Sequence, residues 1–248
     1  MELTVLGASG SYPSARSACS GYLLRHQGYS IWMDAGNGTL KELQRHIALT
    51  DVNAVLLSHA HPDHCADMYP FFYGLLNSQP AHPIPVITPP GVREKLESLV
   101  GGDSIERWRA LLGWRELDAD QETELGPFRV HAFEAAHSIV NNTLRITAGG
   151  RTLCYSGDTG PNPALAGAAQ GADLFLCEAS WIEAQRGIMG PIHLTAQEAG
   201  QAGREAGVGR LMLTHIWPDN DLEVVRRETS SMFEGALSFA VETEAVTV

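Results

Sequence analysis

Three histidines and one aspartate fall within six positions of this chain, in the segment His59-Ala60-His61-Pro62-Asp63-His64. The segment follows the apolar run Ala54–Leu57, which predicts a buried strand. Pro62 cannot continue a strand ladder or a helix interior, so we expect the polar side chains on a loop at the strand's end. Imidazole and carboxylate are ligands of Zn²⁺ and similar ions. The segment therefore predicts a metal site, and the alternative is a polar turn that carries histidines by chance.

The length and composition suit one folded domain. A chain of 248 residues with 44% hydrophobic residues and 25 glycines predicts a single globular domain over residues 1–248. No apolar stretch is long enough to span a bilayer, and Met1–Gly7 lacks the basic region and cleavage site of a signal peptide. The four cysteines form no CxxC pair, and Cys154 and Cys177 lie in apolar runs. We therefore expect a cytoplasmic protein without a membrane partner.

The net charge of the chain constrains which kind of molecule it can bind. The net charge is −12, and the 17 lysines and arginines are scattered along the chain. Proteins that grip long nucleic acids usually present a basic stripe, because phosphate contacts supply most of the affinity. A long nucleic acid is therefore disfavoured as a partner. A small anionic substrate is allowed, since bound cations can reverse the local field.

The first half of the chain predicts strands and a helix before the histidine segment. The expected strands are Leu3–Leu6, Gly21–His26, Tyr29–Asp34 and Ala54–Leu57. Asn37 is expected to cap a helix that continues through His46. A second helix over Asp67–Leu76 carries three aromatic residues, for which core packing is favoured over a pocket wall. Residues 101–120 are poorly patterned and predict no element.

The second half of the chain shows the same pattern as the histidine segment, because a polar residue follows each of three predicted apolar strands. The strands are Leu153–Ser156, Leu174–Cys177 and Leu211–Thr214, and the polar residues are Asp158, Glu178 and His215. Helices are expected between them, over Pro163–Gln170 and Thr195–Ala206. Strands that alternate with helices predict sheets covered by helices. Polar residues at the strand ends are what an open α/β site needs.

The separated motifs together resemble one family. The pattern HxHxDH at residues 59–64 is the signature of the metallo-β-lactamase fold hydrolases, and His137, Asp158 and His215 follow in the family's order. The resemblance covers essentially the whole chain. It implies an α/β fold of the αββα sandwich type, in which two mixed β-sheets are flanked by helices. It also implies a dinuclear metal site along one edge.

The resemblance carries the family's ligands over to this sequence. It implies that His59, His61 and His137 hold one ion, that Asp63, His64 and His215 hold the other, and that Asp158 bridges them. The ions would be divalent, with zinc favoured and manganese or iron also suited to the ligands. A hydroxide shared by two such ions is a nucleophile at neutral pH, and Asp63 also belongs to the implied catalytic set. The other nitrogen of each histidine needs a partner, for which Asp34 is a candidate.

Two further motifs resemble the RNase Z-like phosphodiesterase branch of the family. Leu176–Ser180 is similar to its HEAT or HEST motif, with Cys177 in place of the usual histidine, and His193-Leu194-Thr195-Ala196 is similar to its HST or HxTA motif. The resemblance implies that His193 is the catalytic acid and that Glu178 orients it. The alternative for His193 is a residue beside the helix N-cap Thr195.

The interval between His137 and Asp158 bears on the substrate. It is 21 positions long and has no room for the long arm of enzymes that cut tRNA precursors. With the acidic charge, this points to a small phosphodiester, and the motifs are most similar to atypical class II cyclic-nucleotide phosphodiesterases. The alternatives are a lactonase or thioesterase on the same site, RNase Z-like RNA processing, and a non-catalytic binding module. A homodimer is implied only by the resemblance.

Overall fold

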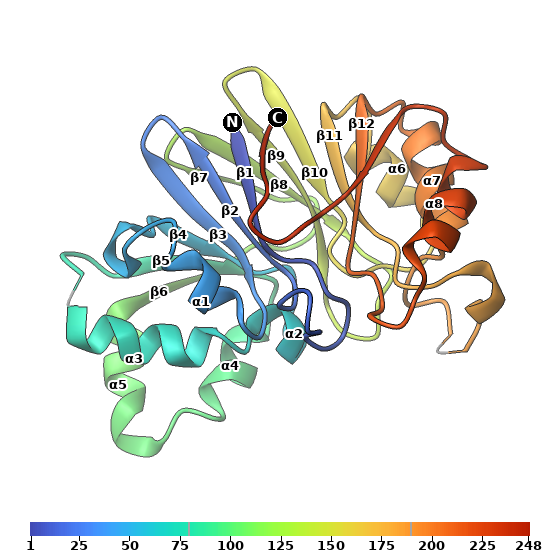
Figure 1. Ribbon diagram of the computed structural model, residues 1–248. Helices are drawn as coiled ribbons and strands as arrows, with labels where there is room; N and C mark the ends of the chain where they lie inside the picture. Colours follow the sequence, from blue (N-terminus) through green and yellow to red (C-terminus); the bar gives the residue numbers. More distant parts are fainter. Residues whose placement is uncertain (79, 189) are drawn as a thin grey trace.

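The computed structural model describes residues 1–78, 80–188 and 190–248. Two seven-stranded sheets face each other in its centre, and helices cover the outer face of each (Figure 1). Both sheets contain parallel and antiparallel pairs, which confirms the predicted αββα sandwich of two mixed sheets.

The first sheet has the strand order β14-β1-β2-β3-β4-β5-β6. Its strands are β1 (Glu2–Gly7), β2 (Gly21–His26), β3 (Tyr29–Ala35), β4 (Ala54–Leu56), β5 (Ile84–Thr88), β6 (Leu112–Glu116) and β14 (Ala245–Thr247). Strands β14 to β3 pair antiparallel, and β3 to β6 pair parallel. The last strand pairs with the first, so the two chain ends lie side by side (Figure 1).

The second sheet has the order β13-β12-β11-β10-β9-β8-β7. Its strands are β7 (Glu122–Leu125), β8 (Phe128–Glu134), β9 (Asn142–Ala148), β10 (Arg151–Tyr155), β11 (Leu174–Glu178), β12 (Arg210–Thr214) and β13 (Ala236–Phe239). Strands β10 to β13 are parallel and β7 to β10 antiparallel. Each sheet therefore has a parallel half, and the carboxyl ends of parallel strands are where polar side chains can gather.

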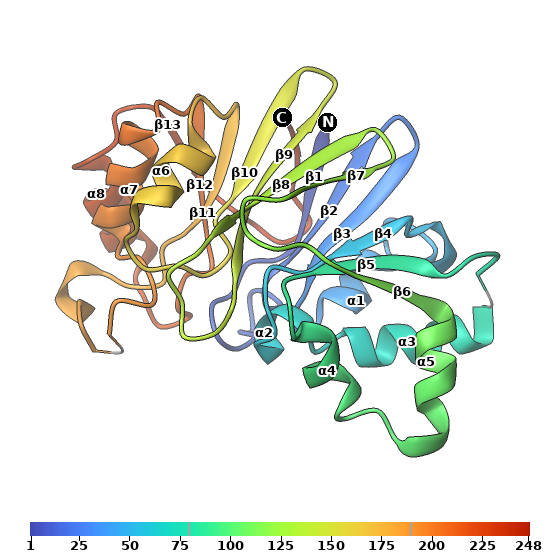
Figure 2. The ribbon, with the colours of Figure 1, turned by 180° about the vertical axis from the view of Figure 1, so that it is seen from behind.

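The helices form the two outer layers (Figure 2). On the first sheet lie α1 (Thr39–Leu43), α2 (Pro62–Cys65), α3 (Met68–Ser78), α4 (Val92–Glu97) and α5 (Ile105–Leu111), and on the second lie α6 (Pro163–Ala169), α7 (Ala196–Glu205) and α8 (Leu222–Ser230). No helix in the described ranges has the length and apolar character needed to cross a membrane.

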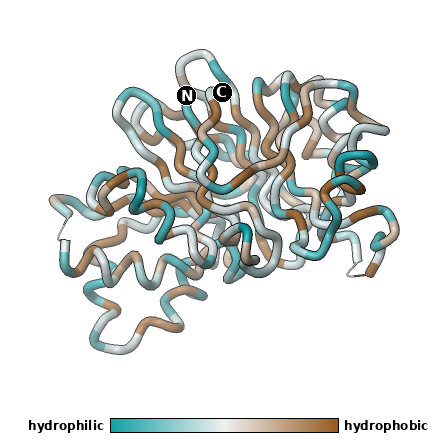
Figure 3. Tube along the Cα trace, viewed as in Figure 1, coloured by the Kyte–Doolittle hydropathy of each residue, from teal (hydrophilic) through white to brown (hydrophobic). Residues whose placement is uncertain are grey.

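Alternation along the strands divides the core into three apolar layers. In β10, Leu153 and Tyr155 point between the sheets, whereas Cys154 points to the helices of the second sheet. Trp32 and Phe71 pack edge to face at 5.2 Å under the helices of the first sheet. Hydrophobic stretches accordingly run through the central strands, and hydrophilic ones gather on outer helices and turns (Figure 3). Burying each large apolar side chain contributes roughly 1.5–3 kcal/mol.

Several predicted elements differ from the structure. Helix α1 begins at Thr39 and ends at Leu43, and its N-cap is Gly38 at φ 96° rather than Asn37. The amide of Leu40 is instead satisfied by the Asp67 carboxylate at 2.7 Å, a partner too distant in sequence to be foreseen. The unpatterned residues 101–120 form α5 and β6, and the elements β7 and α8 were not predicted.

Candidate metal centre

The seven predicted ligands converge from four segments at one edge of the sandwich. His59 and His61 follow β4, His137 follows β8, and Asp158 and His215 follow β10 and β12. Asp63 and His64 do not lie on a loop as expected, because Pro62 begins the short helix α2. Proline fits the first helical position, where its missing N–H has no partner to lose.

Three histidines and one aspartate form a first group of ligand atoms. The Nε2 atoms of His59 and His137 each lie 3.0 Å from Nδ1 of His61. Asp158 Oδ2 lies 3.7 Å from His59 Nε2 and 3.9 Å from His137 Nε2. All four ligand atoms lie within 4.8 Å of one another, which places four donors around one point.

A second group shares Asp158 with the first. Asp158 Oδ1 lies 3.1 Å from His64 Nε2, and Asp158 Oδ2 lies 3.4 Å from His215 Nε2. Asp63 Oδ2 lies 3.1 Å from His215 Nε2 and 3.6 Å from His64 Nε2. Asp158 is therefore the one candidate ligand that these two groups share.

Two buried atoms of the candidate ligands make no hydrogen bond within the described part of the chain, and this observation tests whether the residues fit a cation. His64 Nε2 and Asp158 Oδ1 lie 3.1 Å apart, but neither atom makes a hydrogen bond of good geometry to any described residue. An unsatisfied buried polar atom costs about 1–3 kcal/mol. Both atoms face the space that the other ligands surround, so a divalent ion there would satisfy them. The donor set therefore fits metal ions.

The protonation of the site also suits metal binding. Burial lowers the pKa of His59, His61 and His137, so these imidazoles favour the neutral form that binds metal. Burial opposes ionisation of Asp63 and Asp158, but neighbouring histidines hold the pKa of both carboxyls below the usual value. The three histidines of the first group thus favour the neutral form, beside two ionised carboxylates.

Asp34, the predicted partner of a ligating histidine, supports the centre from within. Its fully buried carboxylate accepts four hydrogen bonds of 2.7 Å, from the Ser58 amide, the Ser58 hydroxyl, His64 Nδ1 and the Tyr155 hydroxyl. Burial lowers the pKa of His64, but Asp158 and the other nearby carboxylates raise it well above the usual value. The contact with Asp34 directs Nε2 of His64 towards the ligand group.

Other histidines of the centre are oriented in the same way. His137 Nδ1 lies 2.9 Å from the carbonyl of Ile192, and His215 Nδ1 lies 2.8 Å from the hydroxyl of Ser180. A ring nitrogen that donates to such a partner leaves the opposite nitrogen free as a ligand. The sequence reasoning did not single out Ile192 or Ser180, although Ser180 stands within the quoted motif.

His193 and Glu178 form a pair beside the ligand group. His193 Nδ1 lies 3.0 and 3.2 Å from the two oxygens of the fully buried Glu178 carboxylate. Burial alone would lower the pKa of His193, but Glu178 raises it to about 9. The His193 ring lies 5.5 Å from that of His215 and 5.1 Å from that of His137. Thr195 is also the N-cap of α7, so the motif serves both the site and the helix.

Cys177 lies away from this pair. Its side chain is fully buried in the apolar layer between the second sheet and its helices. The next residue, Glu178, points to the opposite face of β11, because side chains alternate along a strand. The cysteine that stands in place of the motif's usual histidine therefore packs in the core and takes no part in the Glu178–His193 contact.

The loop after β1 also reaches the centre, which the sequence reasoning missed. The Ser11 amide donates to Asp63 Oδ2 at 3.0 Å. A Cβ atom on Gly10 would lie 2.5 Å from the carbonyl oxygen of His215, so only glycine allows this close approach. The signal available in the sequence was the glycine-rich turn Gly7–Pro13 itself.

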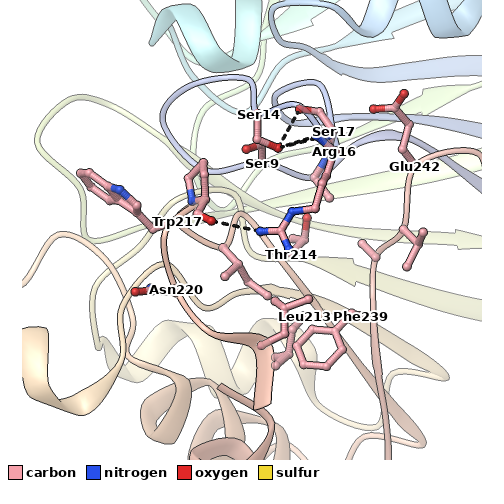
Figure 4. Close-up of a pocket in the computed structure, with 16 residues that line it drawn as sticks. Ser9, Ser14, Arg16, Ser17, Leu213, Thr214, Trp217, Asn220, Phe239 and Glu242 are labelled. Atoms are coloured by element: carbon pink, nitrogen blue, oxygen red, sulfur yellow. Dashed lines mark hydrogen bonds between the residues drawn. The ribbon is translucent and has the colours of Figure 1, made fainter. Parts of the chain in front are cut away.

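A separate cavity of about 190 Å³ lies beside the segment that carries His215. Leu213 and Phe239 line its apolar part, and Arg16 donates to the carbonyl of Pro218 at 3.1 Å at its rim (Figure 4). Trp217 lines one side, and its indole lies well apart from the side chains of Leu213 and Phe239 (Figure 4). None of the seven candidate ligands lines this cavity, so it is distinct from the metal centre.

Comparison with known proteins shows the family. The model of the Beta-lactamase superfamily domain matches residues 29–216, and the chain belongs to this family. The "Probable metallo-hydrolase YhfI" of Bacillus subtilis is 29% identical over 244 residues, covering 97% of each chain. The "Uncharacterized protein ML1173" of Mycobacterium leprae is 37% identical over 251 residues, covering 98% of this chain and 87% of that protein.

Solved structures show the same fold. The crystal structure of YhfI superposes with a TM-score of 0.90 at 28% identity and covers 99% of both chains. The short form of human tRNase Z has a TM-score of 0.80 at 21% identity, covering 100% of this chain and 99% of that one. A diphosphatase of the PhnP family has a TM-score of 0.79 at 15% identity, covering 100% and 97%. The last two likenesses concern the fold alone.

Proposed function

We propose that this protein is a metal-dependent hydrolase that cleaves a small phosphodiester. The observation that carries the proposal is the pair of His193 and Glu178, 3.0 Å apart, placed directly beside seven converging ligands. A metal centre alone would suit many hydrolytic reactions on this fold. A histidine fixed by a buried carboxylate adds a group that can protonate a leaving oxygen.

The ligands would hold two divalent ions, with zinc favoured. His59, His61 and His137 would bind one, Asp63, His64 and His215 the other, and Asp158 both. Two ions held in this way would supply Lewis acidity to the phosphate oxygens and to the attacking water. Zinc, manganese and iron all suit mixed imidazole and carboxylate ligands.

The remaining chemistry belongs to side chains of this chain. Glu178 accepts the hydrogen bond from His193 Nδ1 and holds the ring in one orientation. The other nitrogen, Nε2, is then available to donate a proton to the departing alkoxide oxygen. Ser180 donates to Glu178 Oε2 at 2.6 Å and fixes that carboxylate in turn. General acid catalysis of this kind contributes about 10²–10⁴-fold.

The short connection between His137 and Asp158 supports a small substrate. It consists of a loop and the hairpin of β9 and β10, which leaves no arm to hold a folded RNA. The net charge of −12 points the same way. RNase Z-like RNA processing is the second candidate. A lactonase or thioesterase would share the metal ligands without requiring the His193–Glu178 pair.

A substrate panel tests the proposal. The metal-loaded protein is assayed with bis(p-nitrophenyl) phosphate, an N-acyl homoserine lactone, a thioester and a chromogenic β-lactam. We expect turnover of the phosphodiester, and the variant His193→Ala should lose about 10²–10⁴-fold of it while both ions remain bound. His131→Ala removes a half-buried histidine on β8 and should leave turnover unchanged. Opening of the lactone alone would show the proposal to be wrong.

The proposal also includes a reducing compartment. All four cysteines are buried and unpaired, as expected for a cytoplasmic protein.

The homodimer that the family resemblance implies stays a prediction. Light scattering after gel filtration tests it, with a mass near twice 26.8 kDa as the expected result.

A further inference from the structure

Three aromatic side chains from separate segments form a continuous row beside His193. Tyr12 lies in the loop after β1, Trp181 follows β11, and Trp217 follows His215 by two positions. Tyr12 meets Trp217 edge on, with ring centroids 6.1 Å apart, and Trp217 lies 4.5 Å from Trp181. Trp181 meets the His193 ring edge on at 6.0 Å. We call Tyr12, Trp217 and Trp181 the aromatic row.

Hydrogen bonds hold the Tyr12 side chain and the Trp181 backbone in place. The Tyr12 hydroxyl donates to Asp219 Oδ2 at 3.3 Å. The Trp181 amide donates to Leu194 at 3.1 Å, and its carbonyl accepts from Ala196 at 2.8 Å. Exposure rises along the row, from 6% at Trp181, through the half-buried Trp217, to 39% at Tyr12. The row therefore runs from the proposed acid, where Trp181 is almost buried, to solvent, where Trp217 and Tyr12 present accessible ring surface.

A cavity of about 150 Å³ adjoins the inner end of the row. Trp181 and His193 both line it, together with Arg186. The Arg186 guanidinium is already paired, with Glu183 at 2.8 Å and with Glu198. The positive charge of the guanidinium is thus neutralised within the protein. A neutral flat group suits this space better than a second phosphate.

We propose that the aromatic row binds the base of a nucleotide whose phosphodiester lies at the metal centre. This inference rests on the proposed function and narrows its substrate class. A nucleotide joins a phosphodiester to a flat aromatic ring, and the row offers accessible indole surface on Trp217 and phenol surface on Tyr12, separated from the proposed acid by Trp181. Stacking on aromatic side chains tolerates every base, because each has a π-face. The row therefore selects for a base and discriminates little among bases.

The test compares two substrates that differ only in the base. Adenosine 3′,5′-cyclic phosphate and the 3′,5′-cyclic phosphate of methyl riboside are hydrolysed by the metal-loaded protein and followed by ³¹P NMR. We expect kcat/KM to be about 5- to 150-fold higher for the adenosine compound, the range that stacking of one base provides. Trp217→Ala should remove most of this preference by raising KM, and Trp217→Phe should restore it.

A control variant and a binding measurement complete the design. Tyr73→Ala removes another exposed aromatic residue, on α3, and should leave the preference unchanged. Calorimetric titration of the metal-loaded protein with AMP and with ribose 5-phosphate reports on the row without turnover. Tighter binding of AMP that is lost in Trp217→Ala supports the inference.

The outcomes separate the two proposals. Equal hydrolysis of both cyclic phosphates, or an equal effect of Trp217→Ala on both, overturns the base-binding role and leaves the phosphodiesterase standing. Absence of turnover across both the cyclic phosphates and the earlier panel refutes the proposed function. In that case the titration with AMP still tests whether the aromatic row binds a base. Equal affinity for AMP and ribose 5-phosphate overturns the base-binding role.

Discussion

Replacing Asp34 by asparagine should weaken metal binding, although Asp34 touches no metal in the proposed arrangement. Asp34 Oδ1 accepts from the backbone amide of Ser58, which cannot rotate away, and Oδ2 accepts from His64 Nδ1. An amide has one oxygen and one NH₂ group. In either orientation, one of these two donors faces the NH₂ group. The substitution must therefore leave the Ser58 amide unpaired or disturb His64.

The size of the effect follows from these contacts. If the NH₂ group faces His64, the proton of that ring moves to Nε2 and blocks the ligand atom. Loss of such a supporting contact typically lowers metal affinity about 10- to 100-fold, or about 1.4–2.7 kcal/mol. If it faces Ser58, the unpaired amide costs about 1–3 kcal/mol of stability. Competition with a chromogenic chelator measures the affinity, and urea denaturation of the metal-free protein measures the stability.

Asp67→Asn is the matched control for Asp34→Asn. Asp67 is a buried carboxylate that accepts from the Leu40 amide at 2.7 Å, and it belongs to neither ligand group. The variant Asp67→Asn should bind metal with an affinity within about twofold of that of the unmodified protein. If Asp34→Asn also keeps both its affinity and its stability, the reasoning about the support of His64 is refuted.

Three further predictions follow from the same geometry. Asp158→Ala should remove both ions, because its carboxylate belongs to both groups; retention of two ions in plasma mass spectrometry contradicts the bridging role. Glu178→Gln should lower kcat while both ions remain bound. The decrease should be smaller than the loss of about 10²–10⁴-fold expected for His193→Ala. An unchanged kcat contradicts the orienting role. Gly160→Ala places a Cβ atom 1.7 Å from a backbone carbonyl oxygen and should cost about 1–3 kcal/mol, which calorimetry detects as a lower Tm. Gly167→Ala, in α6 with open space around it among the described residues, should leave Tm unchanged or raise it.

The sequence carried most of the information needed to place the candidate ligands. Apolar strands followed by polar residues indicated where Asp158, Glu178 and His215 lie, since the carboxyl ends of parallel strands share an edge. The histidine segment was found in the same way, but its helix was not. Pro62 was taken to exclude helix, whereas it occupies the first helical position. Local rules for proline depend on the position within an element, which sequence alone left open.

What sequence reasoning missed depends on contacts between distant segments. The start of α1 is set by Asp67, and the Ser11 amide reaches Asp63 across 52 positions. Tyr12 and Trp217 are likewise brought together only by the fold. No periodicity or short motif encodes such contacts, because they arise from the register of strands and the lengths of loops. The supporting residues and the aromatic row therefore required the structure.

Anomalous X-ray diffraction from crystals grown with zinc would test the central claim most directly. The account predicts two peaks at the zinc edge, one among His59, His61 and His137, the other among Asp63, His64 and His215, with Asp158 between them. A single peak, or peaks elsewhere with these side chains hydrogen-bonded to one another, would contradict it.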